Sequence, residues 1–172
     1  IAGGADAILI PELPYDINKV ASALSERKKR GKNFSIVVVA EGAKSTDGKM
    51  HVSKAIADSP DPIRLGGIGT KIAEELEQLV GLEARATILG HIQRGGTPSS
   101  HDRILSTRYG AAAVELLMNG TFGHMVTLKG DRMCSAPLEE VIGKNKGVDP
   151  DCEMVRTARG IGICFGDESC GM

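Results

Sequence analysis

Aromatic side chains are scarce in this 172-residue sequence, which has no tryptophan, two tyrosines and three phenylalanines. A protein that binds single-stranded nucleic acid by stacking needs several aromatic rings on one surface. The formal net charge is −1, so the sequence also lacks the basic excess that is typical of proteins that bind phosphate backbones. We therefore expect no nucleic-acid partner.

Long apolar runs and metal-ligand clusters are lacking as well. No stretch approaches the roughly 20 apolar residues that span a bilayer, and no charged and then apolar signal segment opens the sequence. The histidines do not cluster with carboxylates at zinc-site spacing, and no C-x-x-C pair occurs among Cys134, Cys152, Cys164 and Cys170. We therefore expect no membrane contact, no metal site, a cytoplasmic location and reduced thiols.

Apolar, β-branched runs alternate with segments whose apolar residues recur at helical spacing. The predicted strands cover 6–10, 35–40, 87–89 and 125–129, and the predicted helices cover 16–30, 68–79, 98–119 and 137–142. Residues 43–62 are polar and have little periodicity, so we expect a long loop there. The alternation predicts an α/β fold with a mainly parallel sheet, flanking helices and right-handed crossovers.

The segment Thr87–Pro98 is the most informative part of the sequence. Its first three residues suit a buried strand, its two glycines suit a tight turn, and Thr97 suits the N-cap of the next helix. We expect that helix to bury Ile104, Leu105, Ala112, Leu116 and Leu117.

A helix that begins just after His91 and Arg94 would place its N–H groups beside two further donors. This arrangement predicts a site for a phosphorylated small molecule. The alternative is a simple corner with a solvated histidine and arginine, which a Gly-Gly corner alone would favour.

The exact string Gly90-His-Ile-Gln-Arg-Gly-Gly96 decides between these interpretations. Together with Arg85 before it and Asp102–Leu105 after it, the string resembles the phosphofructokinase family. The resemblance extends through most of the sequence, including the strings at 10–12, 39–42 and 155–159. The glycine-rich phosphate loop and the Thr-Ile-Asp-Asn-Asp-type segment with the family's catalytic aspartate are absent from this sequence.

The resemblance therefore implies a partial fold, the C-terminal, substrate-side half of a phosphofructokinase, with no catalytic residue in this fragment. Residues 1–92 would form a lobe that binds fructose 6-phosphate. Residues 93–172 would return to the nucleotide lobe and end in a tail. The other half of the enzyme is then an obligatory partner.

The resemblance also implies a reaction and a set of binding residues. The whole enzyme would transfer a phosphoryl group from ATP, or from pyrophosphate, to the 1-hydroxyl of fructose 6-phosphate in glycolysis, with Mg²⁺. His91, Arg94 and Arg85 would bind the 6-phosphate, with Arg85 reaching across an interface of a homo-oligomer, and Glu41 would accept hydrogen bonds from sugar hydroxyls. The fragment alone would bind neither ATP nor Mg²⁺ and would be inactive.

Three further residues resemble an allosteric effector pocket of the family. Glu12 matches its acidic residue, and the spacing of Arg30 and Lys32 before Glu41 matches two of its cationic positions, although Ile10 replaces a glycine that is usual there. Non-catalytic sensors of sugar phosphates or nucleotides and structural assembly fragments remain as alternatives. An oxidoreductase would need a dinucleotide fingerprint, which the sequence lacks.

Overall fold

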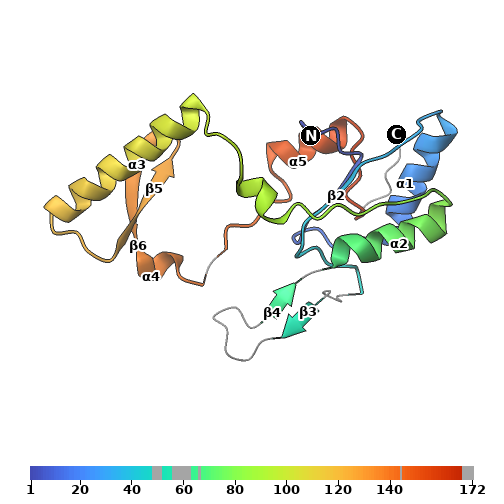
Figure 1. The fold of residues 1–172 in the computed structure, drawn as a ribbon, viewed down its shortest axis with the longest axis horizontal. Coiled ribbons are helices and arrows are strands. Elements are labelled where there is room, and N and C mark those ends of the chain that lie inside the picture. The colour runs from blue at the N-terminus through green and yellow to red at the C-terminus, as the bar shows by residue number, and fades with distance from the viewer. Residues whose placement is uncertain (48–51, 56–62, 66, 144, 168–172) are drawn as a thin grey trace. The chain divides into compact units, whose positions relative to one another are not determined.

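The computed structural model describes residues 1–47, 52–55, 63–65, 67–143 and 145–167. The chain divides into two compact units, which are drawn in Figure 1. Unit 1 comprises residues 1–88 and 147–172, and unit 2 comprises residues 89–146. The predicted boundary after residue 92 separates functional lobes, and that assignment stays a prediction.

A short parallel strand pair lies at the centre of unit 1. Strand β1 (Ala7–Leu9) pairs in parallel with β2 (Val37–Val39), and a parallel bridge from Ala7 to Cys164 extends the pairing on the other side of β1. Both strands were predicted from their continuous apolar runs, which are typical of strands that are covered on both faces.

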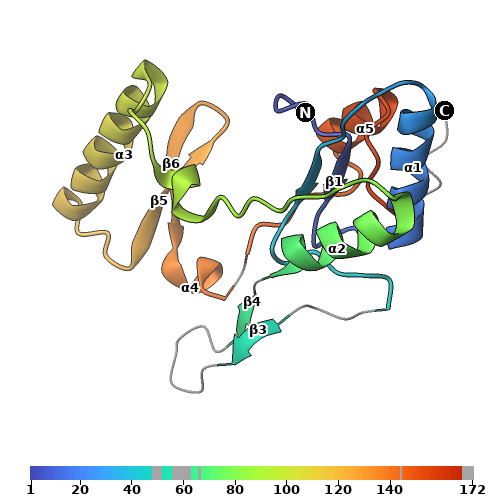
Figure 2. The same ribbon diagram turned by 45° about the vertical axis from the view of Figure 1, so that its right-hand side comes forward.

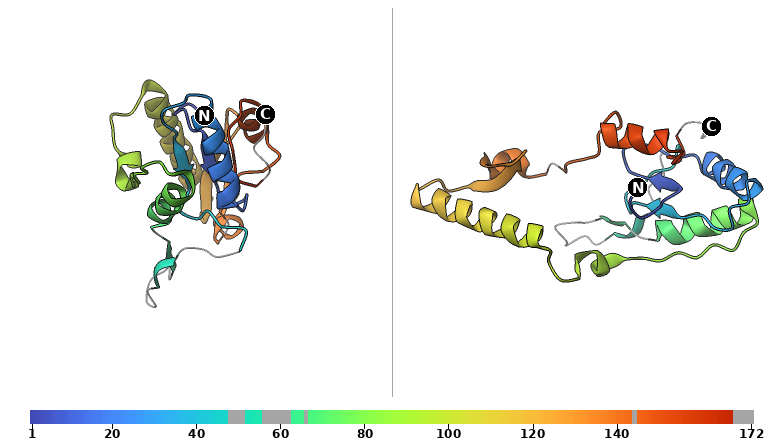
Figure 3. Two further views of the ribbon diagram at one scale, coloured as in Figure 1. Left: turned by 90° about the vertical axis from the view of Figure 1, so that its right-hand side faces the viewer. Right: turned by 90° about the horizontal axis from the view of Figure 1, so that it is seen from above.

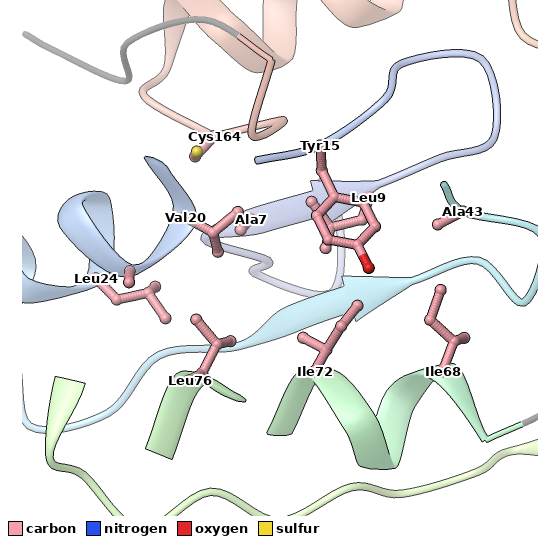
Figure 4. Close-up of a cluster of buried hydrophobic side chains, with 11 residues drawn as sticks. Ala7, Leu9, Tyr15, Val20, Leu24, Ala43, Ile68, Ile72, Leu76 and Cys164 are labelled. Atoms are coloured by element: carbon pink, nitrogen blue, oxygen red, sulfur yellow. The ribbon is translucent and has the colours of Figure 1, made fainter. Parts of the chain in front are cut away.

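Helices cover both faces of β1, as the sequence predicts. Ala7 and Leu9 face a core formed with α1 (Ile17–Lys29) and α2 (Ile68–Val80), which Figure 4 shows. Ile8 and Ile10 face a second cluster formed with α5 (Glu153–Gly160). In the right-hand view of Figure 3, α2 and α5 lie on opposite sides of the strand pair.

The ends of α1 and α2 follow the local sequence. Asp16 is the N-cap of α1, and its Oδ1 accepts a hydrogen bond of 2.9 Å from the Asn18 N–H. Gly81 ends α2 in the left-handed conformation, with φ of 64°. Near the end of α1, Arg27 forms an ion pair of 2.7 Å with Asp6, which ties the helix to the start of β1. The predictions for these two helices are confirmed.

The expected loop over residues 43–62 contains a strand. Strands β3 (Val52–Ala55) and β4 (Ile63–Leu65) form an antiparallel pair with an irregular register. The loop prediction is therefore wrong for 52–55, because a strand is stabilised by its partner strand and needs no long apolar run of its own. Residues 48–51 and 56–62 lie outside the described residues.

Unit 2 pairs one long helix with a β-hairpin, as Figure 2 shows. Its elements in chain order are a 3₁₀ helix η1 (Gly90–Arg94), α3 (Ser100–Met118), β5 (His124–Lys129), β6 (Arg132–Pro137) and α4 (Leu138–Val141). A two-residue turn with positive φ at Gly130 joins β5 to β6. The sequence predicts β5 and the short helix α4, but β6 was missed, although Gly130-Asp131 is a hairpin signal.

Two predictions around the start of α3 are wrong. Residues Thr87–Leu89 form no strand, and the Ile88 side chain is 73% exposed. An apolar triplet becomes a buried strand only where another strand pairs with it, and none pairs with it among the described residues. The N-cap of α3 is Ser99 and not Thr97, because Ser99 forms a capping box with Asp102.

The predicted burial of α3 is also wrong for part of the set. Leu105, Ala112 and Leu116 are half-buried, whereas Ile104 and Leu117 are 63% and 59% exposed. The reason is geometric: the β5–β6 hairpin covers one face of the helix, and no other described element of unit 2 packs against its opposite face.

The described cysteines differ in whether they form a disulfide bond. Cys134 and Cys152 are free, as expected, but Cys164 is disulfide-bonded, so the expectation of reduced thiols is wrong for that residue. Cys170 lies outside the described residues.

Within the described part of the chain, no helix combines the length and the apolar character that a membrane crossing requires.

Candidate functional site

The 3₁₀ helix η1 holds His91 and Arg94. Its turns are closed by hydrogen bonds from the Ile92 N–H to the Leu89 carbonyl, 3.0 Å, and from the Gly95 N–H to the Ile92 carbonyl, 3.1 Å. Side chains three residues apart eclipse one another in a 3₁₀ helix, so His91 and Arg94 lie on the same side of η1. Both are exposed to solvent. The structure therefore brings these two predicted residues together.

The glycines that follow η1 have a backbone role. Gly96 adopts a φ of 98°, which favours glycine strongly over other residues. A Cβ atom on Gly95 would lie 3.4 Å from the Ile92 carbonyl oxygen, an ordinary contact. The turn that carries the chain from η1 towards α3 therefore depends on Gly96 more than on Gly95.

The start of α3 differs from the predicted anion site. Asp102 Oδ2 accepts hydrogen bonds from the Ser99 N–H, 2.8 Å, and the Ser99 hydroxyl, 2.7 Å, and the Asp102 N–H donates to Ser99 Oγ, 3.2 Å. The hydrogen bonds from Ser99 hold the Asp102 pKa below its ordinary value of 3.8, so the group stays a carboxylate. A negative charge in the first turn disfavours a phosphate there, which leaves His91 and Arg94 as the donors of this segment.

Arg85 lies in unit 1 and has a local partner. Its Nε and Nη2 donate to Glu83 Oε1 at 2.8 and 2.7 Å. The two side chains are 84% and 69% exposed, and an ion pair at that exposure contributes little to stability. The Arg85 guanidinium can therefore exchange Glu83 for a phosphate at small cost.

Two predicted carboxylates follow the two parallel strands of unit 1. Glu41 comes two residues after β2 and is exposed, and Glu12 comes three residues after β1. Parallel strands end at the same edge of a sheet, and that edge is where α/β proteins bind ligands. The structure therefore places Glu12 and Glu41 at one edge, the edge that this fold uses for binding.

Glu12 has a second contact that the sequence did not reveal. Its Oε1 accepts a hydrogen bond of 2.9 Å from the Val148 N–H, and a Cβ atom on Gly147 would lie only 2.8 Å from that oxygen. Among the described residues, Oε2 of Glu12 is buried without a hydrogen-bond partner. Glu12 therefore ties the two chain segments of unit 1 together, through a contact 136 residues away in sequence that no local pattern signals.

The two cations of the predicted effector set lie at the end of α1. Arg30 is the C-cap of α1, and Gly31, with φ of 81°, separates it from Lys32. Both cations are exposed, and Arg30 lies 3.9 Å from Glu26, a loose contact. Both belong to unit 1, as Glu12 does.

The predicted substrate residues are divided between the two units. Glu41 and Arg85 belong to unit 1, and His91 and Arg94 belong to unit 2. Among the described residues, no group of three or more histidines, cysteines or acidic side chains could hold a metal ion. The four predicted substrate residues comprise two arginines, a histidine and a carboxylate, which are groups able to bind anions and hydroxyls.

Comparisons with other sequences agree with the resemblance seen in the strings. The model of the Phosphofructokinase family matches residues 1–117. The ATP-dependent 6-phosphofructokinase 2 of Clostridium perfringens is 58% identical over 168 residues, which are 97% of this chain and 46% of that protein. The ATP-dependent 6-phosphofructokinase of Chloroflexus aurantiacus is 48% identical over 98% of this chain and 45% of its own length. The chain thus spans just under half the length of these curated relatives.

Solved structures show the same fold. The pyrophosphate-dependent phosphofructokinase of Nitrosospira multiformis is 26% identical, with a TM-score of 0.63 over 83% of this chain and 34% of that chain. The phosphofructokinase of Saccharomyces cerevisiae is 24% identical, with a TM-score of 0.62 over 92% of this chain and 18% of that chain. The predicted fold class, a partial α/β phosphofructokinase fold, is confirmed. The chain belongs to the phosphofructokinase family.

Proposed function

We propose that this chain is the sugar-phosphate-binding part of an ATP-dependent 6-phosphofructokinase. The whole enzyme transfers a phosphoryl group from ATP to the 1-hydroxyl of fructose 6-phosphate, a cytoplasmic step of glycolysis. The observation that carries the proposal is the 58% identity, over 97% of this chain, to a protein named for that activity.

The geometry of η1 supports binding of the 6-phosphate by His91 and Arg94. An arginine fork makes two parallel hydrogen bonds to a phosphate, and charge-assisted hydrogen bonds are about twice as strong as neutral ones. In the proposed complex Arg85 releases Glu83 and reaches the phosphate bound to a neighbouring subunit, so the enzyme is a homo-oligomer. Glu41 accepts hydrogen bonds from sugar hydroxyls.

Phosphoryl transfer depends mainly on positioning and on stabilising charge. This chain would position fructose 6-phosphate, the phosphoryl acceptor, whereas binding of the phosphoryl donor needs residues that this chain lacks. Mg²⁺, when bound, would neutralise charge on the transferring phosphates, and we assign it, with the donor, to the part of the enzyme that this chain does not span. The higher identity to ATP-dependent relatives, 58% against 26% for the pyrophosphate-dependent structure, favours ATP as the donor.

Reconstitution tests this function. The chain is co-expressed with the part of the Clostridium perfringens relative that it does not match, and the purified complex is assayed with fructose 6-phosphate and either ATP or pyrophosphate. We expect turnover with ATP. A complex that forms and binds fructose 6-phosphate without turning over either donor would favour the alternative, a non-catalytic sugar-phosphate sensor.

We also propose an effector pocket that contains Glu12, Arg30 and Lys32. Its support is the pair of exposed cations at the end of α1 and the buried, unpartnered Oε2 of Glu12 among the described residues. Arg30→Ala in the reconstituted enzyme should alter the response to a nucleoside diphosphate or to phosphoenolpyruvate while turnover without effector stays within about twofold, since coupling is separable from chemistry. Lys28→Ala, also exposed near the end of α1, is the control. An enzyme that does not respond to either effector would refute the pocket.

A further inference from the structure

Glu41 lies in a turn that is fixed at both of its ends. The Ala40 N–H donates to the Leu9 carbonyl, 2.9 Å, and so continues the pairing of β2 with β1. The Ala43 N–H donates to the Ala40 carbonyl, 2.9 Å, which closes a β-turn that contains Glu41. The Ala43 side chain is 1% exposed and belongs to the core. The exposed carboxylate of Glu41 is therefore carried by a turn with a buried anchor.

Tyr15 binds the segment that follows this turn. The Tyr15 N–H donates to the Lys44 carbonyl, 2.9 Å, and the Tyr15 carbonyl accepts from the Thr46 N–H, 2.9 Å. These bonds make a parallel bridge between Tyr15 and Ser45. The Tyr15 side chain is buried in the same core cluster as Ala43, which Figure 4 shows. A displacement of Tyr15 would therefore displace the turn as well.

Residues 164–167 pack against Tyr15 and the start of α1. The Gly166 carbonyl accepts a hydrogen bond of 2.8 Å from the Asp16 N–H. Gly166 has a φ of 77°, and a Cβ atom there would lie 2.9 Å from the Tyr15 Cβ and 3.4 Å from the Tyr15 Cα. Real Cβ atoms do not approach other atoms so closely, so the lack of a side chain at Gly166 lets this segment reach Tyr15.

Contacts at both ends hold residues 164–167 in place. At the start, Cys164 forms a parallel bridge to Ala7 of β1. At the end, the Arg159 guanidinium donates to both carboxylate oxygens of Asp167, at 3.0 and 2.5 Å, and Lys19 Nζ donates to the Asp167 carbonyl, 2.6 Å. The segment that touches Tyr15 is thus tied to β1, to α1 and to α5.

We propose that Tyr15 is a positioning residue for Glu41 and that residues 164–167 hold Tyr15 in place. The contacts form a continuous path within unit 1, from Gly166 through Tyr15 and Thr46 to the turn that carries Glu41. A misplacement of about 1 Å in a positioned group can lower a rate roughly 100-fold. The inference rests on the proposed function, because it assumes that Glu41 binds sugar hydroxyls.

A double-mutant cycle in the reconstituted enzyme tests this path, since a chain of contacts alone does not demonstrate coupling. Gly166→Ala places a methyl group against Tyr15 and should lower kcat/KM for fructose 6-phosphate about tenfold, while KM for ATP stays within about twofold. Glu41→Ala should lower the same kcat/KM at least tenfold. Adding Gly166→Ala to Glu41→Ala should lower it by less than about threefold further, because the displaced group is already absent.

Gly4→Ala is the matched control for Gly166→Ala. Gly4 also lies in unit 1 with a positive φ, 73°, but a Cβ atom there would meet nothing within 4 Å. This variant has the backbone strain without the contact to Tyr15, so kcat/KM for fructose 6-phosphate should stay within about twofold of the parent.

Tyr15 itself supplies a second pair of variants, which keeps the test decisive if Gly166→Ala folds poorly. Tyr15→Leu changes the shape of the buried side chain and should give the same selective loss for fructose 6-phosphate. Tyr15→Phe keeps the ring and should restore kcat/KM at least fivefold relative to Tyr15→Leu.

Amide hydrogen exchange in the 172-residue chain follows the turn without relying on activity. Each rate is taken relative to that of the Leu24 N–H in α1, which corrects for a general loss of stability. The Ala43 and Thr46 N–H groups should exchange at least tenfold faster in Gly166→Ala than in Gly4→Ala, because their bonds depend on the position of Tyr15.

Equal kcat/KM in Gly166→Ala and Gly4→Ala, or fully multiplicative losses in the double variant, would overturn the proposal. Unchanged exchange at Ala43 and Thr46 would also overturn it. A reconstituted complex without turnover, or Glu41→Ala with parent kinetics, would contradict the proposed function. Faster exchange at Ala43 and Thr46 would in that case still support Tyr15 as the residue that positions the turn.

Discussion

Arg94 is the last residue of η1, and its side chain is exposed on the same side as His91. Arg94→Ala in the reconstituted enzyme should lower kcat/KM for fructose 6-phosphate about 10- to 100-fold. The reason is the loss of a charge-assisted hydrogen bond to the phosphate, which contributes roughly 1.5–3 kcal/mol. Steady-state kinetics at varied sugar phosphate measure the effect.

The control for Arg94 is Arg132→Ala. Arg132 is also an exposed arginine of unit 2, but it lies on β6 and has no proposed contact with substrate. Equal kinetics in the two variants would remove Arg94 from the site.

Alanine substitutions at two glycines of unit 1 distinguish the cost of backbone strain from the cost of steric crowding. Both glycines have positive φ, 77° at Gly166 and 81° at Gly31. A Cβ atom on Gly166 would lie 2.9 Å from the Tyr15 Cβ and 3.0 Å from a Val20 methyl. A Cβ atom on Gly31 would have no described atom within 4 Å. Gly31→Ala should cost about 1–2 kcal/mol from the left-handed backbone alone. Gly166→Ala should cost roughly 1–3 kcal/mol more through crowding.

Urea unfolding of the chain, followed by far-ultraviolet circular dichroism, measures both free energies of unfolding. A change in midpoint at constant slope reports stability rather than a change in compactness. Equal losses in the two variants would show that Tyr15 and Val20 accommodate the added methyl group.

At the scale of the element, the capping box makes the stability of α3 depend on pH. The hydrogen bonds from Ser99 lower the folded-state pKa of Asp102. A lowered pKa means that the stabilisation is present above the unfolded-state value of about 3.8 and is lost as the pH falls through the folded-state value. Asp102→Ala should therefore lower the melting temperature at pH 7, and the difference from the parent should narrow as the pH falls below about 4.

Ser99→Ala is the matched variant for the capping box, because it removes the hydroxyl partner of the same pair. It should destabilise the helix by about 1 kcal/mol at pH 7, the usual effect of losing an N-cap. Adding Asp102→Ala to it should then change the melting temperature less than in the parent. Fully additive effects at pH 7 would show that the two side chains do not act as a pair.

At the scale of the whole molecule, the chain is expected to bind substrate weakly and to have no kinase activity alone. It lacks the glycine-rich phosphate loop and the catalytic aspartate string of its family. Without a positioned donor and a base, the charge that develops in the transition state is not stabilised.

A coupled assay of the purified chain with fructose 6-phosphate and ATP, and again with pyrophosphate, measures this. The reconstituted complex is the positive control, and a mock preparation from the same host detects contaminating kinase. Phosphorylation by the chain above that blank would show that it contains catalytic groups of its own.

The sequence by itself determined the family and most local elements. The string at 90–96 identifies phosphofructokinases, and the runs around β1, β2, α1 and α2 have periodicities and caps that depend only on nearby residues. His91 and Arg94 were predicted together because both belong to that string, whereas the 3₁₀ helix that carries them was not predicted.

Tertiary structure alone decided the rest, because those features depend on which distant segment is present as a neighbour. Thr87–Leu89 has an apolar sequence but lacks a partner strand among the described residues, and Glu12 binds the backbone of Val148 across most of the chain. Ile104 and Leu117 of α3 have the apolar spacing of core residues and are exposed in the structure. Apolar spacing shows that a surface suits burial, but burial itself requires a covering segment.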